Sequence, residues 1–186
     1  MSKNKHKPKL FVFAGANGSG KSSTRESLSL GMGFGVIIDT DAIARTINPE
    51  VPESANVEAG REAIKVARDC ISSGVSFCIE NHIRSAKAAG YELHMFFLGV
   101  DRVEVNIERV EVRVKNGGHD IPEETIRKRY VTSIENLIKI LNLIDELVII
   151  DNSESSRSIL VAKQGKVVSV DEVLPDWAQT IRTYLV

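Results

Sequence analysis

The sequence predicts an α/β fold in which a parallel sheet is covered by helices on both faces. Short, continuous apolar runs alternate with longer segments whose apolar residues recur at helical spacing. Runs that are apolar throughout indicate strands buried on both sides, which is typical of parallel sheets. The 186 residues are enough for one such domain with a real core, so 1–186 are expected to form a single domain.

Five strands are expected along the chain, each at a short apolar run: 10–14, 35–39, 75–80, 93–100 and 147–151. A helix spans the stripe from Val57 to Ile71 and closes at Gly74. Another carries Val103, Val110 and Val114 and stops at the "NGG" of 116–118. Pro122 opens the next helix.

The end of the chain adds two elements to this sheet. Residues 159–170 are expected to form a β-hairpin with Gly165 in its turn, and 174–185 a short helix. The expected architecture is therefore a three-layer α/β fold with a five-stranded parallel sheet, a C-terminal β-hairpin and a short helix.

Composition argues against several function classes. The net charge is −1, so no global field attracts nucleic acid or acidic membranes, and only residues 1–9 form a basic, frayed tail. No apolar run approaches the ~20 residues of a membrane span. Cys70 and Cys78 lack metal-ligand spacing and are interpreted as buried thiols in a reducing cytoplasm. We expect a cytoplasmic protein that binds neither nucleic acid nor membrane.

The most informative motif is the stretch "LFVFAGANGSGKSS", residues 10–23, which matches G-x-x-x-x-G-K-[ST] between a strand and a helix. Glycines let backbone amides turn inward as a nest for phosphate, the lysine reaches the β/γ-phosphates, and the Ser22 hydroxyl ligates Mg²⁺. The helix N-terminus points at the same anion. The pattern predicts a nucleotide-binding phosphate loop made of Gly15, Ala16, Asn17, Gly18, Ser19, Gly20, Lys21, Ser22 and Ser23.

Acidic residues follow two of the expected strands, at the sheet edge where ligands of open α/β folds bind. Asp39 and Asp41 lie two apart after the second strand. Asp41 is favoured as the base that deprotonates an attacking hydroxyl, whereas Asp39 is equally compatible with a helix cap. Glu80 ends the third strand and is expected to contact Mg²⁺ or substrate, although a simply solvated acid fits its position too.

Arginines in the second half of the chain can stabilise a transferring phosphoryl group. Arg109 and Arg113 share one helix face, and Arg127 and Arg129 follow the turn "KNGGHD", whose glycines suggest a hinge. Residues 109–129 are therefore expected to behave as a lid. Because Glu104, Glu108 and Glu111 lie on the same helix, a solvated face with ion pairs is the alternative.

These motifs resemble the zeta-toxin family of P-loop kinases over nearly the whole chain, most specifically in "NIERVEVRVKNGGHDIPEETIRKRY", residues 106–130. The resemblance implies a kinase-type P-loop fold, ATP as donor and Mg²⁺, and it places Glu80 near the substrate; the phosphate-loop pattern and the strand end make Ser22 and Glu80 the expected metal ligands. The resemblance also implies Lys21, Asp41 and Arg109 as catalytic residues and places Asn152 near the adenine. Arg113 is expected to bind substrate. The resemblance does not decide which of His119, Arg127 and Arg129 takes the place of the second lid arginine.

Family members phosphorylate a hydroxyl of UDP-N-acetylglucosamine and are held inactive by a helical antitoxin, so a nucleotide sugar and an antitoxin are the expected partners. A kinase of another small metabolite fits the same motifs. A nucleotide-binding module that acts through a partner is a third hypothesis, and it would need neither Asp41 nor the arginines.

One departure from the family falls between Glu80 and Leu93, where only twelve residues make a crossover that usually needs a dozen or more. They leave room for one or two helical turns. Members carry Thr-Thr-Leu-Ser and a fuller helix there, so either this protein lost a substrate-binding segment or the sequence omits one. We favour the omission, which an intact mass above 20.5 kDa would reveal.

Overall fold

The computed structural model describes residues 7–79, 83–118 and 120–186, which form two compact units. The first unit holds the chain up to Val12 and residues 33–93, and the second holds residues 13–32 and 94–186. Among the helices of the described residues, none combines the length and apolar character needed to cross a bilayer.

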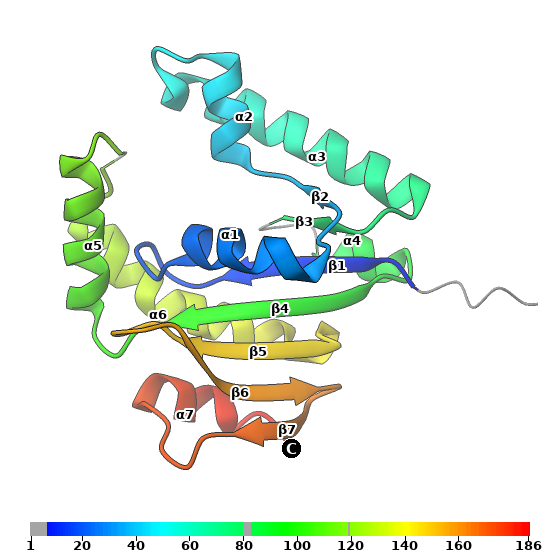
Figure 1. The fold of residues 1–186 in the computed structure, drawn as a ribbon, viewed down its shortest axis with the longest axis vertical. Helices are drawn as coiled ribbons and strands as arrows, with labels where there is room; N and C mark the ends of the chain where they lie inside the picture. The colour runs from blue at the N-terminus through cyan, green and yellow to red at the C-terminus, as the bar shows by residue number, and fades with distance from the viewer. Residues whose placement is uncertain (1–6, 80–82, 119) are drawn as a thin grey trace, which may run out of the picture. The chain divides into compact units, whose positions relative to one another are not determined.

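Three parallel strands form the sheet of the first unit, in the order β2 (Val36–Ile37), β3 (Phe77–Cys78) and β1 (Lys9–Ala14), as Figure 1 shows. β2 and β3 are shorter than the sequence predicts. Phe77 pairs with Leu10 on one side and with Val36 on the other. Phe77 and Leu10 are fully buried, as expected of interior strands, whereas Val36 and Ile37 of β2 are exposed, so the apolar run 35–39 did not mark a strand buried on both faces.

Two helices of the first unit pack through small side chains. α2 (Thr40–Ile47) contributes Ala44, and η1 (Pro52–Ala55) and α3 (Asn56–Ser73) contribute Ala55 and Ala59 to one buried cluster. The predicted C-terminus of α3 is confirmed, because Gly74 adopts the left-handed conformation and its N–H bonds to the last turn. α4 (Ile83–Ala88) provides the one or two helical turns expected before β4.

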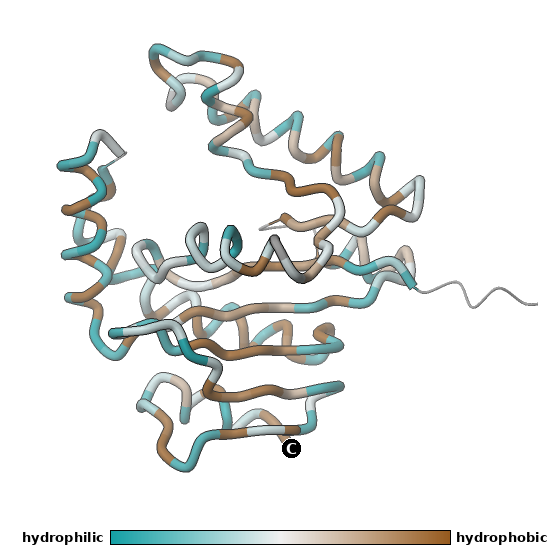
Figure 2. The backbone as a smooth tube through the Cα atoms, in the orientation of Figure 1, coloured by the Kyte–Doolittle hydropathy of each residue, from teal (hydrophilic) through white to brown (hydrophobic). Residues whose placement is uncertain are grey.

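The second unit has a mixed sheet in the order β4 (Glu92–Gly99), β5 (Glu146–Asp151), β6 (Arg157–Lys163) and β7 (Lys166–Val170). β4 and β5 are parallel, whereas β6 and β7 are antiparallel to their neighbours. β4, β5 and β6 are largely apolar in Figure 2, and most of their apolar residues are buried.

The predicted hairpin is confirmed, with Gln164 and Gly165 both at positive φ in its two-residue turn. The predicted five-stranded parallel sheet is not matched, because seven strands occur in the described residues and β6 joins the sheet beside β5. The run 159–170 with Gly165 in its turn predicted the hairpin, but it could not show that β6 would pair with the free edge of β5. Pairing of β6 with this edge of β5 leaves fewer backbone N–H and C=O groups without a hydrogen-bond partner.

Helices α1 (Lys21–Met32), α5 (Val103–Lys115), α6 (Glu123–Ile140) and α7 (Asp176–Arg182) complete the second unit, with η2 (Leu141–Leu143) after α6. The predicted bounds of α5 and α6 hold closely, since α5 ends before Asn116 and α6 begins after Pro122. α7 packs by Trp177 against Phe97 of β4, at 6.2 Å between ring centroids. Gly99 makes this contact possible, because a Cβ there would lie 2.5 Å from the Trp177 ring.

Candidate nucleotide site

The phosphate loop connects β1 to α1 and lies in the second unit. Gly15, Gly18 and Gly20 have φ values of +138°, +74° and +93°, which other residues rarely adopt. Space is restricted as well, because a Cβ at Gly15 would meet the Leu98 carbonyl oxygen and one at Gly18 would lie 2.5 Å from the Asn106 carbonyl oxygen. Glycine is therefore required at these positions by both conformation and packing.

Five consecutive carbonyl groups of this loop accept hydrogen bonds from side chains. Lys21 Nζ donates to the Gly15 and Ala16 oxygens at 3.0 and 2.9 Å. Asn106 Nδ2 donates to Asn17 O at 2.6 Å, and Asn152 Nδ2 donates to Ser19 O at 2.8 Å. Arg109 completes the set with a longer bond of 3.5 Å to Gly18 O.

This pattern has a direct electrostatic consequence. Carbonyls that are occupied by side-chain donors do not compete for the loop's N–H groups, which, apart from the Ser19 N–H bonded to Ala16 O, can serve as donors to an anion. The N-terminus of α1 begins at Lys21 and adds its positive dipole end at the same place. The donors come from α1, α5 and the end of β5, so three separate elements hold one loop.

Arg109 lies between the phosphate loop and the segment after β5. Besides its bond to Gly18 O, its second terminal nitrogen donates to Ser153 O at 3.0 Å. Arg129 of α6 reaches the loop too, donating to Asn17 Oδ1 at 2.9 Å. Two guanidinium groups therefore border the loop within this unit.

Arg127 behaves differently, although it lies only two residues from Arg129. It bonds Glu123 at 2.8 Å and Glu104 at 3.0 Å, an exposed arrangement on α5 and α6. The hydrogen bond from Arg127 lowers the pKa of Glu104. Arg127 therefore fits the alternative given for the arginines, an exposed face with ion pairs. Arg113 is exposed near the end of α5, where its side chain and carbonyl pack on Gly118.

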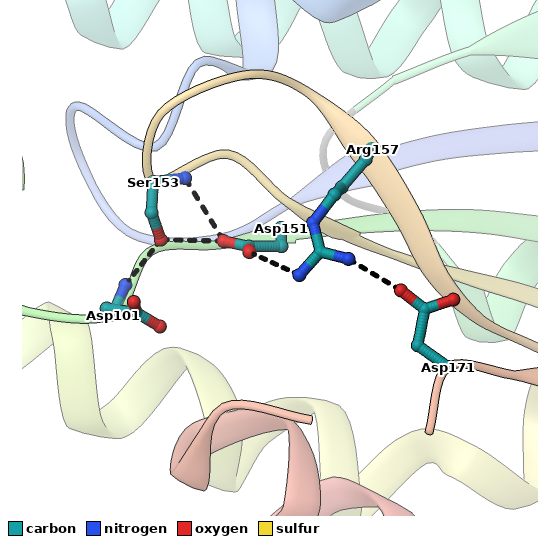
Figure 3. Close-up of polar contacts among 5 residues, drawn as sticks. All are labelled: Asp101, Asp151, Ser153, Arg157 and Asp171. Atoms are coloured by element: carbon teal, nitrogen blue, oxygen red, sulfur yellow. Dashed lines mark hydrogen bonds and ion pairs between the residues drawn. The ribbon is translucent and has the colours of Figure 1, made fainter. Parts of the chain in front are cut away.

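The segment that carries Asn152 and Ser153 is held by a polar network, drawn in Figure 3. Asp151 Oδ1 accepts from the Ser153 N–H at 3.1 Å and from its hydroxyl at 2.6 Å, and Ser153 Oγ in turn accepts from the Asp101 N–H. Arg157 forms an ion pair with Asp151 at 3.4 Å and another with Asp171 at 2.6 Å. This network fixes the backbone from which Asn152 reaches the phosphate loop.

The predicted acidic residues belong to the first unit or fall outside the described residues. Asp39 is the N-cap of α2 and accepts from the Ala42 N–H at 3.0 Å, which supports the capping alternative for it. Asp41 is exposed in the first turn of α2. Glu80 and His119 lie outside the described residues, so the predictions made for them stay predictions.

The residues fit Mg²⁺ that arrives with nucleotide. The Ser22 hydroxyl is exposed in the first turn of α1, and it is an oxygen of the kind that Mg²⁺ prefers. Within residues 7–79, 83–118 and 120–186, no group of three or more His, Cys, Asp or Glu is placed to hold a metal. Mg²⁺ commonly takes one or two protein oxygens and completes its shell with phosphate and water.

The sequence prediction missed Asn106, which is fully buried and bonded to the loop. Val103, Asn106 and Val110 share one face of α5, so a polar residue inside an apolar stripe was the signal that could have revealed it. Arg157 and Asp171 were missed as well, and no spacing rule links residues on different strands in this way.

No protein-family model matches the sequence. A protein of Haemophilus influenzae, described only as uncharacterized, is 36% identical over 104 residues, which cover 51% of this chain and 74% of that protein. Similar solved structures share less sequence and show the fold alone.

AvrRxo1-ORF1, solved in complex with AvrRxo1-ORF2, matches 96% of this chain with a TM-score of 0.66 and 15% identity. This chain spans 65% of that one, which has also been solved with ATP. The PezAT toxin–antitoxin system of Streptococcus pneumoniae matches 99% of this chain and 80% of the other, with a TM-score of 0.63 and 15% identity. A proposed kinase of Chloroflexus aurantiacus matches 69% of this chain and 80% of its own, with a TM-score of 0.55 and 14% identity. The expected zeta-toxin-like P-loop kinase fold is confirmed.

Proposed function

This chain belongs to the same protein family as the Haemophilus influenzae protein and has a zeta-toxin-like P-loop kinase fold, and on that premise we propose that it is an ATP-dependent phosphotransferase. The acceptor would be a hydroxyl group of a small metabolite. The observation that carries the proposal is the phosphate loop itself, whose five carbonyls are occupied by Lys21, Asn106, Arg109 and Asn152. Such a loop is organised for an anion before the anion arrives.

Lys21 and Ser22 would serve the phosphates. The Lys21 ammonium already lies over the loop and would exchange its contacts with Gly15 and Ala16 for the β/γ-phosphates. Ser22 would hold Mg²⁺, which neutralises the developing charge when it is bound. Glu80 is retained in this proposal as the second group at the metal and the substrate.

Arg109 and Arg129 would stabilise the transferring phosphoryl group. Both guanidinium groups hydrogen-bond to the phosphate loop, whereas Arg127 is engaged by two carboxylates. Of the three candidates for the second arginine, Arg129 is therefore the one this proposal adopts. Residues 109–129 would close as a lid that brings both side chains onto the phosphates.

Asp41 would act as the general base. The Asp39 carboxylate accepts a hydrogen bond from the Ala42 N–H and so serves as the cap of α2. The Asp41 carboxylate is exposed and would be open to an incoming hydroxyl. A carboxylate in this role orients the acceptor and takes up its proton.

The acceptor proposed first is the sugar of UDP-N-acetylglucosamine, as the family resemblance implies. A protein partner is proposed from the same resemblance, and the PezAT relative is a toxin–antitoxin system. A partner of this kind would cover the phosphate loop, so added ATP should weaken its binding.

The test uses γ-labelled ATP and Mg²⁺, with and without UDP-N-acetylglucosamine, on the wild type and Asp41→Asn. Transfer of label to the sugar nucleotide that is lost in Asp41→Asn would support both acceptor and base. Release of phosphate at equal rates in both proteins would contradict the kinase and favour a binding module. Turnover that depends on Asp41 without labelling of this acceptor would keep the kinase and exclude this sugar.

The arginine assignment has a matched pair of variants. Arg129→Gln should lower the transfer rate by roughly 100-fold or more, because removal of a transition-state arginine costs orders of magnitude. Arg127→Gln, two residues away on the same helix, should stay within about threefold of the wild type, since exposed ion pairs contribute little. Equal losses in the two variants would contradict the choice of Arg129.

A further inference from the structure

A small cavity lies directly beneath the phosphate loop in the second unit. Ser19 of the loop, Leu98 of β4, Asn106 of α5, Tyr130 and Ser133 of α6 and Trp177 of α7 are among the residues that line it. It offers about 10 Å³ to the centre of a water molecule, close to the space that one buried water occupies.

Three polar atoms of the lining residues have no hydrogen-bond partner among the described residues: Ser19 Oγ, Asn106 Oδ1 and Trp177 Nε1. Their side chains belong to residues exposed by 1%, 0% and 6% respectively. Buried polar groups in native proteins almost always find a partner, either in protein or in ordered water. Three such atoms on residues that line one small cavity therefore point to a shared partner.

The remaining polar groups of the lining are already satisfied. The Tyr130 hydroxyl donates to the carbonyls of Val100 and Asp101, and Ser133 Oγ donates to Tyr130 O. The orientation of the Asn106 amide is fixed, because its Nδ2 must donate to the Asn17 carbonyl. Its Oδ1 is therefore an acceptor that faces away from that bond.

The three atoms also have complementary chemistry. An indole N–H can only donate, an amide oxygen can only accept, and a hydroxyl does both. A water molecule has two protons and two lone pairs, so it can meet all three needs at once. Most of the lining is apolar, and a wholly apolar cavity of this size would stay dry, but three unsatisfied polar atoms supply the two to four partners that a buried water needs.

We propose that one water molecule binds in this cavity, accepts a hydrogen bond from Trp177 Nε1, donates one to Asn106 Oδ1 and shares one with the Ser19 hydroxyl. It thereby connects α7 and α5 to the phosphate loop. The position of Trp177 is fixed by its contact with Gly99, and Asn106 holds the Asn17 carbonyl, so the bridge ends on groups that are themselves anchored. α7 thus becomes part of the support of the nucleotide site.

The first experiment needs no nucleotide. Trp177 is the only tryptophan, so its indole N–H gives a single resonance in a ¹⁵N-labelled sample of the full chain. A cross-peak from this proton to water, with the sign of a long-lived complex, is the expected result. Absence of that cross-peak while the indole resonance is well resolved would overturn the water site.

The second experiment tests the coupling to the loop and rests on the proposed function. Trp177→Phe keeps an aromatic side chain but removes the indole N–H donor together with the outer ring atoms that lie nearest Gly99, so its affinity is compared beside its thermal stability. Loss of one bridging hydrogen bond should weaken ATP binding about threefold to tenfold. Tyr184→Phe, an exposed aromatic change in the residues after α7, is the matched control and should leave affinity unchanged.

The outcomes separate the two proposals. Failure of the wild type to bind ATP would contradict the proposed function and leave the cross-peak result standing by itself. Wild-type binding with a Trp177→Phe affinity within twofold would overturn the coupling. Thermal unfolding of both variants, measured beside binding, shows that affinity is compared between folded proteins.

Discussion

Replacement of Gly20 by alanine should expose how the phosphate loop is held. Gly20 has a φ of +93°, and a Cβ at this position would overlap the Asn152 amide nitrogen. The left-handed backbone costs an alanine about 1–2 kcal/mol. Displacing Asn152 removes its bond to Ser19 O, a further ~1 kcal/mol.

These two costs add because they act on the same conformation of the loop. The free loop of Gly20→Ala can relax, whereas the nucleotide-bound loop cannot, so the sum appears as lost affinity. A total of about 2–3 kcal/mol weakens ATP binding roughly 30- to 150-fold. The assay is calorimetric titration of ATP with Mg²⁺ at 25 °C.

A double-mutant cycle separates the two contributions. In an Asn152→Ala background no amide is displaced, so Gly20→Ala should cost only the backbone share, about 5- to 30-fold. Gly31→Ala is the matched control, since nothing lies within 4 Å of its Cβ position near the end of α1. Equal penalties in both backgrounds would refute the role of Asn152, and a Gly20→Ala affinity within twofold of the wild type would refute the whole argument.

Four further results are expected. Gly60→Ala within α3, where a Cβ meets nothing within 4 Å, should raise the free energy of unfolding by about 0.5–1 kcal/mol in urea titrations. Burial, with smaller contributions from nearby carboxylates, raises the pKa of Tyr130, so wild-type stability should be lost as pH rises above about 10, and Tyr130→Phe should flatten that loss. Burial likewise raises the pKa of the Cys70 thiol, so iodoacetamide should label it only after unfolding, and rapid labelling of folded protein would contradict its burial. An intact mass equal to 20.5 kDa would exclude an omitted segment after Glu80.

Local pattern was sufficient to predict most elements of the fold. Gly74, the "NGG" of 116–118 and Pro122 gave helix bounds because each acts on the backbone within a residue or two. The short β2 and β3 show the limit of the method, since an apolar run indicates burial and not the length over which a neighbour is available for pairing.

Local rules alone predicted the contiguous part of the site, whereas the roles expected of Arg109 and Asn152 came from the family resemblance. The phosphate loop is recognisable because all the residues of its motif lie in one contiguous segment, 15–22. Asn106, Asn152 and Arg129 reach that loop from 89, 133 and 112 residues away. No local rule distinguishes Arg129 from Arg127, because which of the two meets Glu104 depends on how α5 and α6 pack.

The occupied carbonyls of the phosphate loop have a consequence for hydrogen exchange. An ordered loop normally protects its amide protons through the same bonds that order it. Here side chains order the loop through its oxygens, which leaves the amide protons that face the nest to solvent. The loop amide protons that face the nest should therefore exchange quickly, in contrast to the Ser19 N–H, which bonds Ala16 O at 3.3 Å, and a bound phosphate group should slow them without any change of shape. The loop is thus expected to be rigid without its ligand, whereas protection of its amide protons from exchange is expected only when a phosphate group is bound.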